Sequence, residues 1–188
     1  MVTGSITPTS GDVIASLSKH SVIDDRFGLL TSFQLTVLKG YTHGTQLTTF
    51  AEYEEQKSER LYRSNDITDK KYAGATNQLV PGKTYGVKIF AIKQVVTSDD
   101  CLAFLASRNA ILVGAQGISL TRQLKKDEFP VGKWTVSFDK KEALWRDGRG
   151  DRRVPDIFRD SGGGWCFSLG VFRCGWGGGF CLLCFCDF

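Results

Sequence analysis

The stretch from Leu79 to Thr121 constrains the fold most, because it contains two kinds of hydrophobic period in one short segment. Apolar side chains recur at every second position at Tyr85, Val87, Ile89 and Ala91, the period of a strand with one buried face. From Ser98 onward the spacing changes to three and four, which predicts a helix with Ser98 as its N-cap and Asn109 as its left-handed stop. Residues 111–120 then resume extended structure around a glycine bend. The segment therefore predicts a strand, a helix and a second strand.

Three further segments carry regular patterns. Strands are predicted over residues 27–37 and 133–138, where apolar and polar residues alternate. A helix is predicted to begin at Thr49, because Glu52 completes a capping box, and its thin apolar stripe ends at Leu61 and Tyr62. These elements predict an α+β fold, with a mainly antiparallel or mixed β-sheet and two short helices. Six inward positions are expected to form one contiguous core: Val87, Ile89, Leu105, Val113, Trp134 and Val136.

The composition of the chain changes sharply after residue 160. Residues 161–188 contain eight of the 21 glycines, five of the six cysteines and almost no charge. Alternation at Trp165, Phe167 and Leu169 predicts that this tail begins with a strand whose aromatic face must be buried. We therefore divide the chain into a disordered leader (residues 1–12), one α+β domain (residues 13–160) and a Gly/Cys-rich apolar extension (residues 161–188) packed on that domain.

The general character of the chain is that of a globular protein. Its 41% hydrophobic and 23% charged residues are ordinary for a folded domain. The first 18 residues lack the basic and apolar regions of a signal peptide, and no uninterrupted apolar run is long enough to span a membrane. These features predict a soluble, cytoplasmic protein without a membrane span, whose thiols are kept reduced.

An arginine-rich stretch provides the first candidate site. Residues 61–160 contain 18 Lys and Arg against 12 Asp and Glu, a surplus of six positive charges. Four arginines of this region could contact phosphates of an anion or a nucleic acid: Arg146, Arg149, Arg152 and Arg153. The alternative is a solvated hairpin tip whose arginines pair with the interleaved carboxylates of Asp147, Asp151 and Asp156.

The C-terminal cysteines provide a second candidate site. Cys181 and Cys184 have the C-x2-C spacing that lets two thiolates bind one tetrahedral metal ion, and Cys186 and Cys174 could complete the set. Zinc is the cofactor that such a set would bind. The alternatives are buried reduced thiols in an apolar strand, where cysteine serves as a small hydrophobic residue, and disulfides or acylation.

Catalytic chemistry has weaker support in the sequence. Cys101 lies near an expected helix N-terminus, which lowers a thiol pKa, but adjacent aspartates and apolar neighbours oppose that effect. His20 and His43 are the two available histidine bases, and both are distant in the sequence. The adjacent carboxylates of Asp24 and Asp25 point to opposite sides of an extended chain. We therefore predict no catalytic residue.

These observations favour a non-catalytic binding or protein-interaction module. Its partner is expected to be another protein or a second copy of the chain, contacted through the apolar extension. The first alternative is weak anion or nucleic-acid binding through the basic region of residues 122–159. The second is a small hydrolase or a Cys-ligated metal protein.

Overall fold

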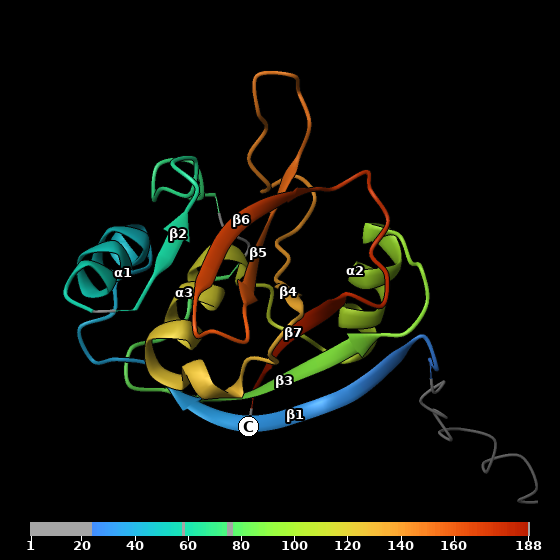
Figure 1. Cartoon of the computed structure of the whole chain (residues 1–188), viewed down its shortest axis with the longest axis horizontal. Coiled ribbons are helices and arrows are strands. Elements are labelled where there is room, and N and C mark those ends of the chain that lie inside the picture. Colours follow the sequence, from blue (N-terminus) through green and yellow to red (C-terminus); the bar gives the residue numbers. More distant parts are fainter. Residues whose placement is uncertain (1–23, 58, 75–76, 188) are drawn as a thin grey trace, which may run out of the picture.

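The computed structural model describes residues 24–57, 59–74 and 77–187; the expected leader and His20 lie outside this part of the chain. The fold is α+β, as predicted, and is built on one seven-stranded mixed sheet with three α-helices (Figure 1). The strand order is β1-β3-β7-β4-β5-β6-β2. The strands are β1 (Phe27–Thr36), β2 (Leu61–Arg63), β3 (Thr84–Ile92), β4 (Trp134–Val136), β5 (Arg153–Arg159), β6 (Trp165–Val171) and β7 (Phe180–Cys186). The helices are α1 (Gln46–Glu55), α2 (Ser98–Ser107) and α3 (Gly114–Lys125), with short 3-10 turns at His43–Thr45 and Lys126–Glu128.

The cysteine-rich tail supplies the middle of this sheet. Strand β7 lies between β3, with which it is antiparallel, and β4, with which it is parallel. Five of its seven residues are buried, including Leu182, Leu183 and Phe185. Strand β6 pairs along its length with β5, antiparallel, and carries β2 on its other side. The apolar side chains of β7 are thus covered by the chain itself.

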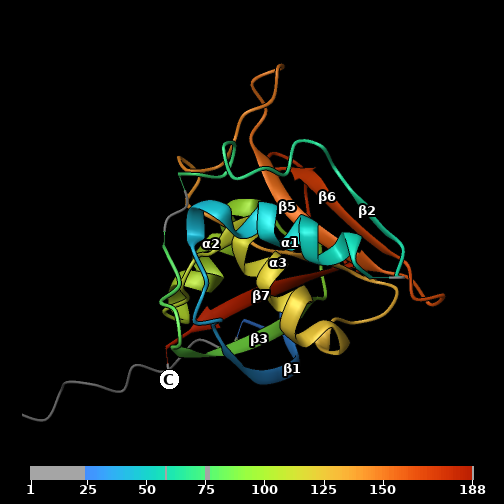
Figure 2. The ribbon, with the colours of Figure 1, turned by 90° about the vertical axis from the view of Figure 1, so that its left-hand side faces the viewer.

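The two faces of the sheet bear separate hydrophobic cores. Helices α1 and α3 lie side by side on one face (Figure 2), and α2 lies on the other (Figure 1). The α3-side core joins α1 and α3 to the sheet and contains Val87, Ile89 and Val113. The α2-side core lies on the opposite face and contains Leu105 and Val136. Trp134 is only half-buried. The prediction of one contiguous core was therefore wrong, because strand alternation sends neighbouring residues to opposite faces of a sheet that is covered on both sides.

A β-bulge in β1 allows this strand to serve both cores. The register against β3 shifts between Leu29 and Thr31. Before the bulge, Phe27 reaches the α2-side core; after it, Leu35 reaches the α3-side core. The one extra residue of a bulge reverses the faces to which the following side chains of a strand point. Side chains of β1 before and after the bulge therefore enter different cores.

Helix α3 was predicted as a strand, and this prediction was wrong. All nine residues from Gly114 to Arg122 are buried, including the polar side chains of Gln116, Ser119 and Arg122, so this part of the helix has no exposed face. Gly117 is tightly packed: a Cβ at that position would lie 2.2 Å from Cγ2 of Val113 and 3.4 Å from a ring carbon of Phe185 on β7. Tertiary packing therefore selects a helix where the apolar run before it indicated extended structure.

Two helix starts also differ from the prediction. Helix α1 begins at Gln46 instead of Thr49, and its first amides at Leu47 and Thr48 donate to the Asp69 carboxylate, each at 2.9 Å. That cap comes from a distant loop and has no local sequence signal. Leu61 and Tyr62 belong to β2 and not to the helix. At α2 the cap is Thr97, which forms a capping box with Asp100, instead of Ser98.

The arginine-rich stretch forms a loop between β4 and β5 that projects from the rest of the molecule (Figure 1). Asp147 organises it by accepting hydrogen bonds from the backbone amides of Arg149 and Asp151. Within the described part of the chain, no helix is both long enough and apolar enough to cross a membrane.

Candidate functional site

Two adjoining cavities open beside the turn that joins β5 to β6. Their volumes are about 360 and 670 Å³, and they share Arg60, Gly162, Gly164 and Trp165 as lining residues. We refer to them together as the glycine-turn cavity. The other lining residues are Glu59, Leu61, Tyr62, Lys126, Arg159, Asp160 and Gly163.

The turn needs glycine for two separate reasons. Gly163 has a φ of +85°, which residues with a side chain rarely adopt. Gly164 donates its amide to the Asp160 carboxylate at 2.7 Å, and a Cβ on Gly164 would lie 2.4 Å from the other carboxylate oxygen. As a consequence, the wall of the cavity is bare backbone, which a ligand can approach closely.

Three cations from distant parts of the sequence converge on this turn. Arg60 precedes β2, and among the described residues its guanidinium has no hydrogen-bond or ion-pair partner. Lys126 follows α3 and pairs with Glu59. Arg159 ends β5 and reaches three carbonyl oxygens and Asp127 only at 3.3–3.5 Å. Hydrogen bonds of that length are weak, and the Arg159 guanidinium also lies 5.4 Å from the centre of the Trp165 ring.

Two carboxylates partly balance this charge. Glu59 accepts from Lys126 and from Arg122, and the hydrogen bond from Lys126 is the main cause that lowers its pKa. Asp160 is engaged with the turn. The lining therefore carries three positive and two negative groups, and both negative groups already hold the surrounding structure together.

A buried ion cluster lies under the cavity. The Arg122 side chain is 1% exposed, donates to Glu54 at 3.0 Å and to Glu59 at 2.7 Å, and lies 4.3 Å over the Trp165 ring. Burial raises the pKa of Glu54, and the Arg122 charge opposes that rise. The cluster ties α1, α3 and β6 together behind Glu59 and so fixes the position of that side of the cavity.

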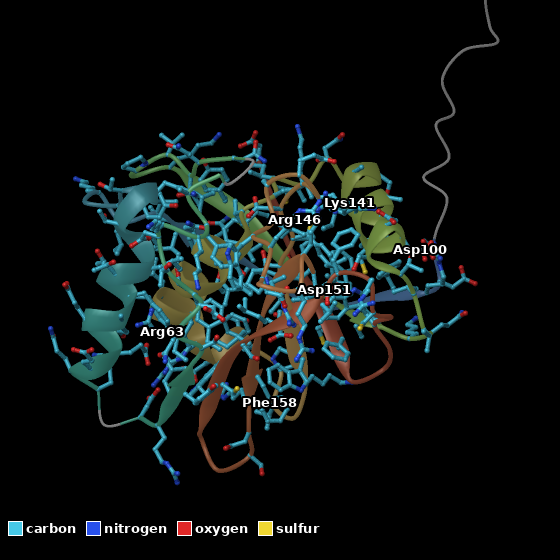
Figure 3. All side chains as sticks on the ribbon, turned by 90° about the horizontal axis from the view of Figure 1, so that it is seen from above. Arg63, Asp100, Lys141, Arg146, Asp151 and Phe158 are labelled. Atoms are coloured by element: carbon cyan, nitrogen blue, oxygen red, sulfur yellow. The ribbon has the colours of Figure 1, made fainter. Side chains whose placement is uncertain are left out.

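The structure does not bring the four arginines of the hairpin loop together. Arg146 donates to the Gly150 carbonyl at 3.0 Å, and Arg153 pairs with Asp147 at 2.5 Å. Arg149 is exposed, and Arg152 lines a different cavity of about 380 Å³ together with Lys141 and Arg173. Figure 3 shows Arg146 and Lys141 at the opposite end of the sheet from Phe158, which is near the β5–β6 turn. Two of the four guanidinium groups thus serve the loop itself.

The C-terminal cysteines are likewise separated. Cys181 faces the α3-side core and Cys184 the α2-side core, because three residues along a strand change the face. Burial raises the pKa of these thiols to about 11 and about 12, respectively. Cys186 lies at the end of β7, where its thiol donates to the Gly86 carbonyl at 3.3 Å, and Cys174 is exposed in the loop before β7. In the part of the chain that the structure describes, no three His, Cys, Asp or Glu side chains are placed to hold a metal ion.

The residues considered for catalysis do not converge either. Cys101 is fully buried in the α2-side core, where desolvation raises its pKa to about 12. His43 is buried on the other side of the sheet, where its Nδ1 lies 3.0 Å from the Tyr41 hydroxyl and burial lowers its pKa. Asp24 is held by Arg26. Cys101 and His43 therefore do not form a catalytic pair of a cysteine thiolate and a histidine base.

The chain was compared with family models, with curated proteins and with solved structures, and none of the three comparisons returned a match.

One buried carboxyl outside the cavity has an altered acidity. Asp156 lies on β5 between Val136 and Ser168 in the sheet register and is 5% exposed. Its Oδ1 has no hydrogen-bond partner among the described residues. Burial raises its pKa from 3.8 to about 7. The folded state therefore binds a proton at Asp156 between about pH 4 and pH 7, where the unfolded chain does not.

The sign of this shift gives a pH-dependent prediction. Stability contributed by protonated Asp156 is fully present below about pH 4 and is lost as the pH rises through 7. We expect Asp156→Asn to raise the free energy of unfolding by about 1–3 kcal/mol at pH 8, because the buried charge is removed, and by much less at pH 4.5. Urea unfolding at the two pH values measures the difference. The control is Asp127→Asn, at an exposed carboxylate, which should change stability by less than about 0.5 kcal/mol at both pH values. An effect of Asp156→Asn that does not depend on pH would contradict the raised pKa of Asp156.

Proposed function

We propose that this protein is a non-catalytic binding module that recognises a phosphate or carboxylate group in the glycine-turn cavity. The observation that carries the proposal is the convergence of Arg60, Lys126 and Arg159 on a wall of bare glycine backbone. Lys126 and Arg159 belong to the basic region of residues 122–159, whereas Arg60 does not.

The chemistry of these groups fits an oxyanion. Guanidinium groups present paired donors that match phosphate and carboxylate oxygens, and Arg60 and Arg159 are respectively unpaired and loosely paired. Glu59 and Asp160 are occupied by Lys126, Arg122 and the turn itself. A carboxylate held in this way is a poor general acid or base, which favours binding over catalysis at this cavity.

A titration with pyrophosphate tests the proposal. We expect amide NMR shifts at residues 162–164, and we expect Arg60→Gln to weaken binding by about 3- to 10-fold, because one charge-assisted contact is lost. Arg149→Gln is the matched control, since it removes an exposed arginine from the hairpin loop without touching the cavity. Affinity should fall with added salt. Shifts confined to the hairpin loop, or equal effects of the two variants, would contradict the proposal.

One observation favours a second location for the same activity. The cavity between the hairpin loop and α2 is lined by Lys141, Arg152 and Arg173, and the buried Nε of Arg152 has no hydrogen-bond partner among the described residues. Asp99 and Asp151 pair with Lys141 and Arg173, respectively, which reduces the positive charge there. In the same titration, loss of binding on Arg152→Gln but not on Arg60→Gln would place the anion at this second cavity.

A contact with another protein through residues 161–188, as expected from the sequence, would have little apolar surface to use. Strand β7 is buried, so only half-exposed side chains of the tail such as Phe180 remain for such a contact.

A further inference from the structure

We propose that the ligand of this module is a single-stranded nucleic acid, whose bases stack on a row of aromatic side chains beside the glycine-turn cavity. The proposal rests on the proposed function, because the cavity supplies the phosphate contacts. The aromatic row consists of Tyr62, Phe158, Trp134 and Phe180.

The strand register places these four side chains on one line across the sheet. Tyr62 of β2 and Phe158 of β5 both lie beside Cys166 of β6, one from each side. Trp134 of β4 lies beside Phe158, and Phe180 of β7 lies beside Trp134. Residues in register on neighbouring strands point to the same face, so the row crosses five strands on the face that also bears α2.

The row is at least partly accessible, and two of its members contact each other. Tyr62 is 66% exposed, and Phe158, Trp134 and Phe180 are half-buried. The Trp134 and Phe158 ring centroids are 5.1 Å apart with tilted planes. Figure 3 shows the Phe158 side chain at the end of the sheet near the β5–β6 turn. At about 4.8 Å per strand, the row from Tyr62 to Trp134 spans roughly 14 Å, enough for more than one stacked base.

Charge and aromatic surface meet at Tyr62. It lines the glycine-turn cavity together with Arg60, so a phosphate at Arg60 would have the Tyr62 ring next to it. Lys133, adjacent to Trp134, adds a half-exposed cation whose Nζ donates to the Gly178 carbonyl at 2.8 Å. The opposing charges are those of Glu59 and Asp160, both already paired, and of the buried Asp156.

Among nucleic acids, a single strand fits both chemistries of this surface, the aromatic rings and the cations. Bases in a duplex are stacked on each other, whereas those of a single strand can stack on protein side chains while cations follow the backbone. Stacking tolerates any base, because every base has a π-face. We therefore expect little sequence preference.

Fluorescence anisotropy of labelled oligonucleotides of about 12 nucleotides tests the proposal, with the full chain as binder. Oligo(dT) and oligo(rU) compare DNA with RNA, and a duplex of equal length is the reference. We expect both single strands to bind more tightly than the duplex, and we expect Arg60→Gln to decrease the size of the log–log salt slope by about 0.7, the value for one phosphate contact.

The decisive variants are Tyr62→Ala and Tyr62→Phe. Removal of the exposed ring should weaken oligonucleotide binding by roughly 5- to 150-fold. The phenylalanine variant keeps the ring and should therefore retain the oligonucleotide affinity. Pyrophosphate affinity, measured in parallel, should fall far less than oligonucleotide affinity in Tyr62→Ala, because pyrophosphate has no base to stack on the ring. If pyrophosphate binds through Arg60 but Tyr62→Ala leaves oligonucleotide affinity intact, the nucleic-acid proposal fails and the anion site stands. If neither pyrophosphate nor oligonucleotide binding depends on Arg60, the anion site itself fails.

Discussion

A chain that ends at Asp160 should lose cooperative unfolding and bind a hydrophobic dye. The truncation removes β6 and β7, and β7 is the strand that joins β3 to β4. What remains is the β1–β3 pair and the β4–β5 pair, with no strand between them. Among the buried side chains that the deletion removes are Phe167, Leu182, Leu183 and Phe185. At about 1.5–3 kcal/mol each, these four contribute about 6–12 kcal/mol, which is comparable with the whole stability of a typical domain.

The control for this experiment is a chain that ends at Cys186. It keeps all of β7 and loses the Asp187 carboxylate, whose ion pair with Lys83 is exposed and contributes little. Circular dichroism during urea unfolding and dye fluorescence compare the two chains. A cooperative, dye-silent fragment of residues 1–160 would show that the sheet does not depend on its central strand, contrary to the architecture described above.

The elements predicted correctly are those whose two sides differ in polarity. Strand β3 and helix α2 each have a clear period, and Asn109 adopts the left-handed conformation expected of a helix stop, with φ 52°. Helix α3 was missed for two reasons. It is buried on every side from Gly114 to Arg122, so its polar residues do not mark an exposed face, and its two glycines argue against a helix.

The position of β7 could not be derived from the sequence for a different reason. Its apolar, cysteine-bearing pattern indicates burial, but chain order does not state which strands become neighbours. Strands that are distant in the sequence meet here: β7 pairs with β3, roughly a hundred residues earlier, as the pair of Gly86 and Cys186 shows. A tail that looked like an extension therefore forms the centre of the sheet.

The candidate site was accessible to sequence reasoning only in part. The triple glycine at 162–164 was visible, and so was the surplus of positive charge. The sequence did not show that Arg60 and Lys126, which are far from that turn in the chain, lie beside it. Arg60 is placed there by the parallel pairing of β2 with β6, and Lys126 by the end of α3. The dense arginine cluster of the hairpin loop was the stronger local signal, yet two of its four side chains bind the loop itself.

Arg122→Ala should lower the free energy of unfolding by about 3–5 kcal/mol at pH 7, because it leaves a carboxylate uncompensated in the interior. Glu54 is 7% exposed, and Arg122 is the cation that donates to it. Loss of the guanidinium also removes the group that lies over Trp165. Urea unfolding of the full chain measures the change.

The same variant should show a characteristic pH dependence. Burial already raises the pKa of Glu54 above 4.5, and without the Arg122 charge the rise is no longer opposed. A raised pKa means that stability is retained below about pH 4.5 and lost as the pH rises through the folded-state value, so the cost of Arg122→Ala should be smaller at pH 4 than at pH 7.

A double variant separates the charge from the packing. Arg122→Met with Glu54→Gln removes both charges from this pair, keeps most of the side-chain volume and should recover much of the stability lost in Arg122→Ala. Arg122→Lys retains the charge but not the planar guanidinium group that reaches Glu54 and Glu59 together, so it should recover only part of the stability lost in Arg122→Ala. If the double variant is as unstable as Arg122→Ala at every pH, then the loss comes from packing against Trp165 and not from the buried carboxylate.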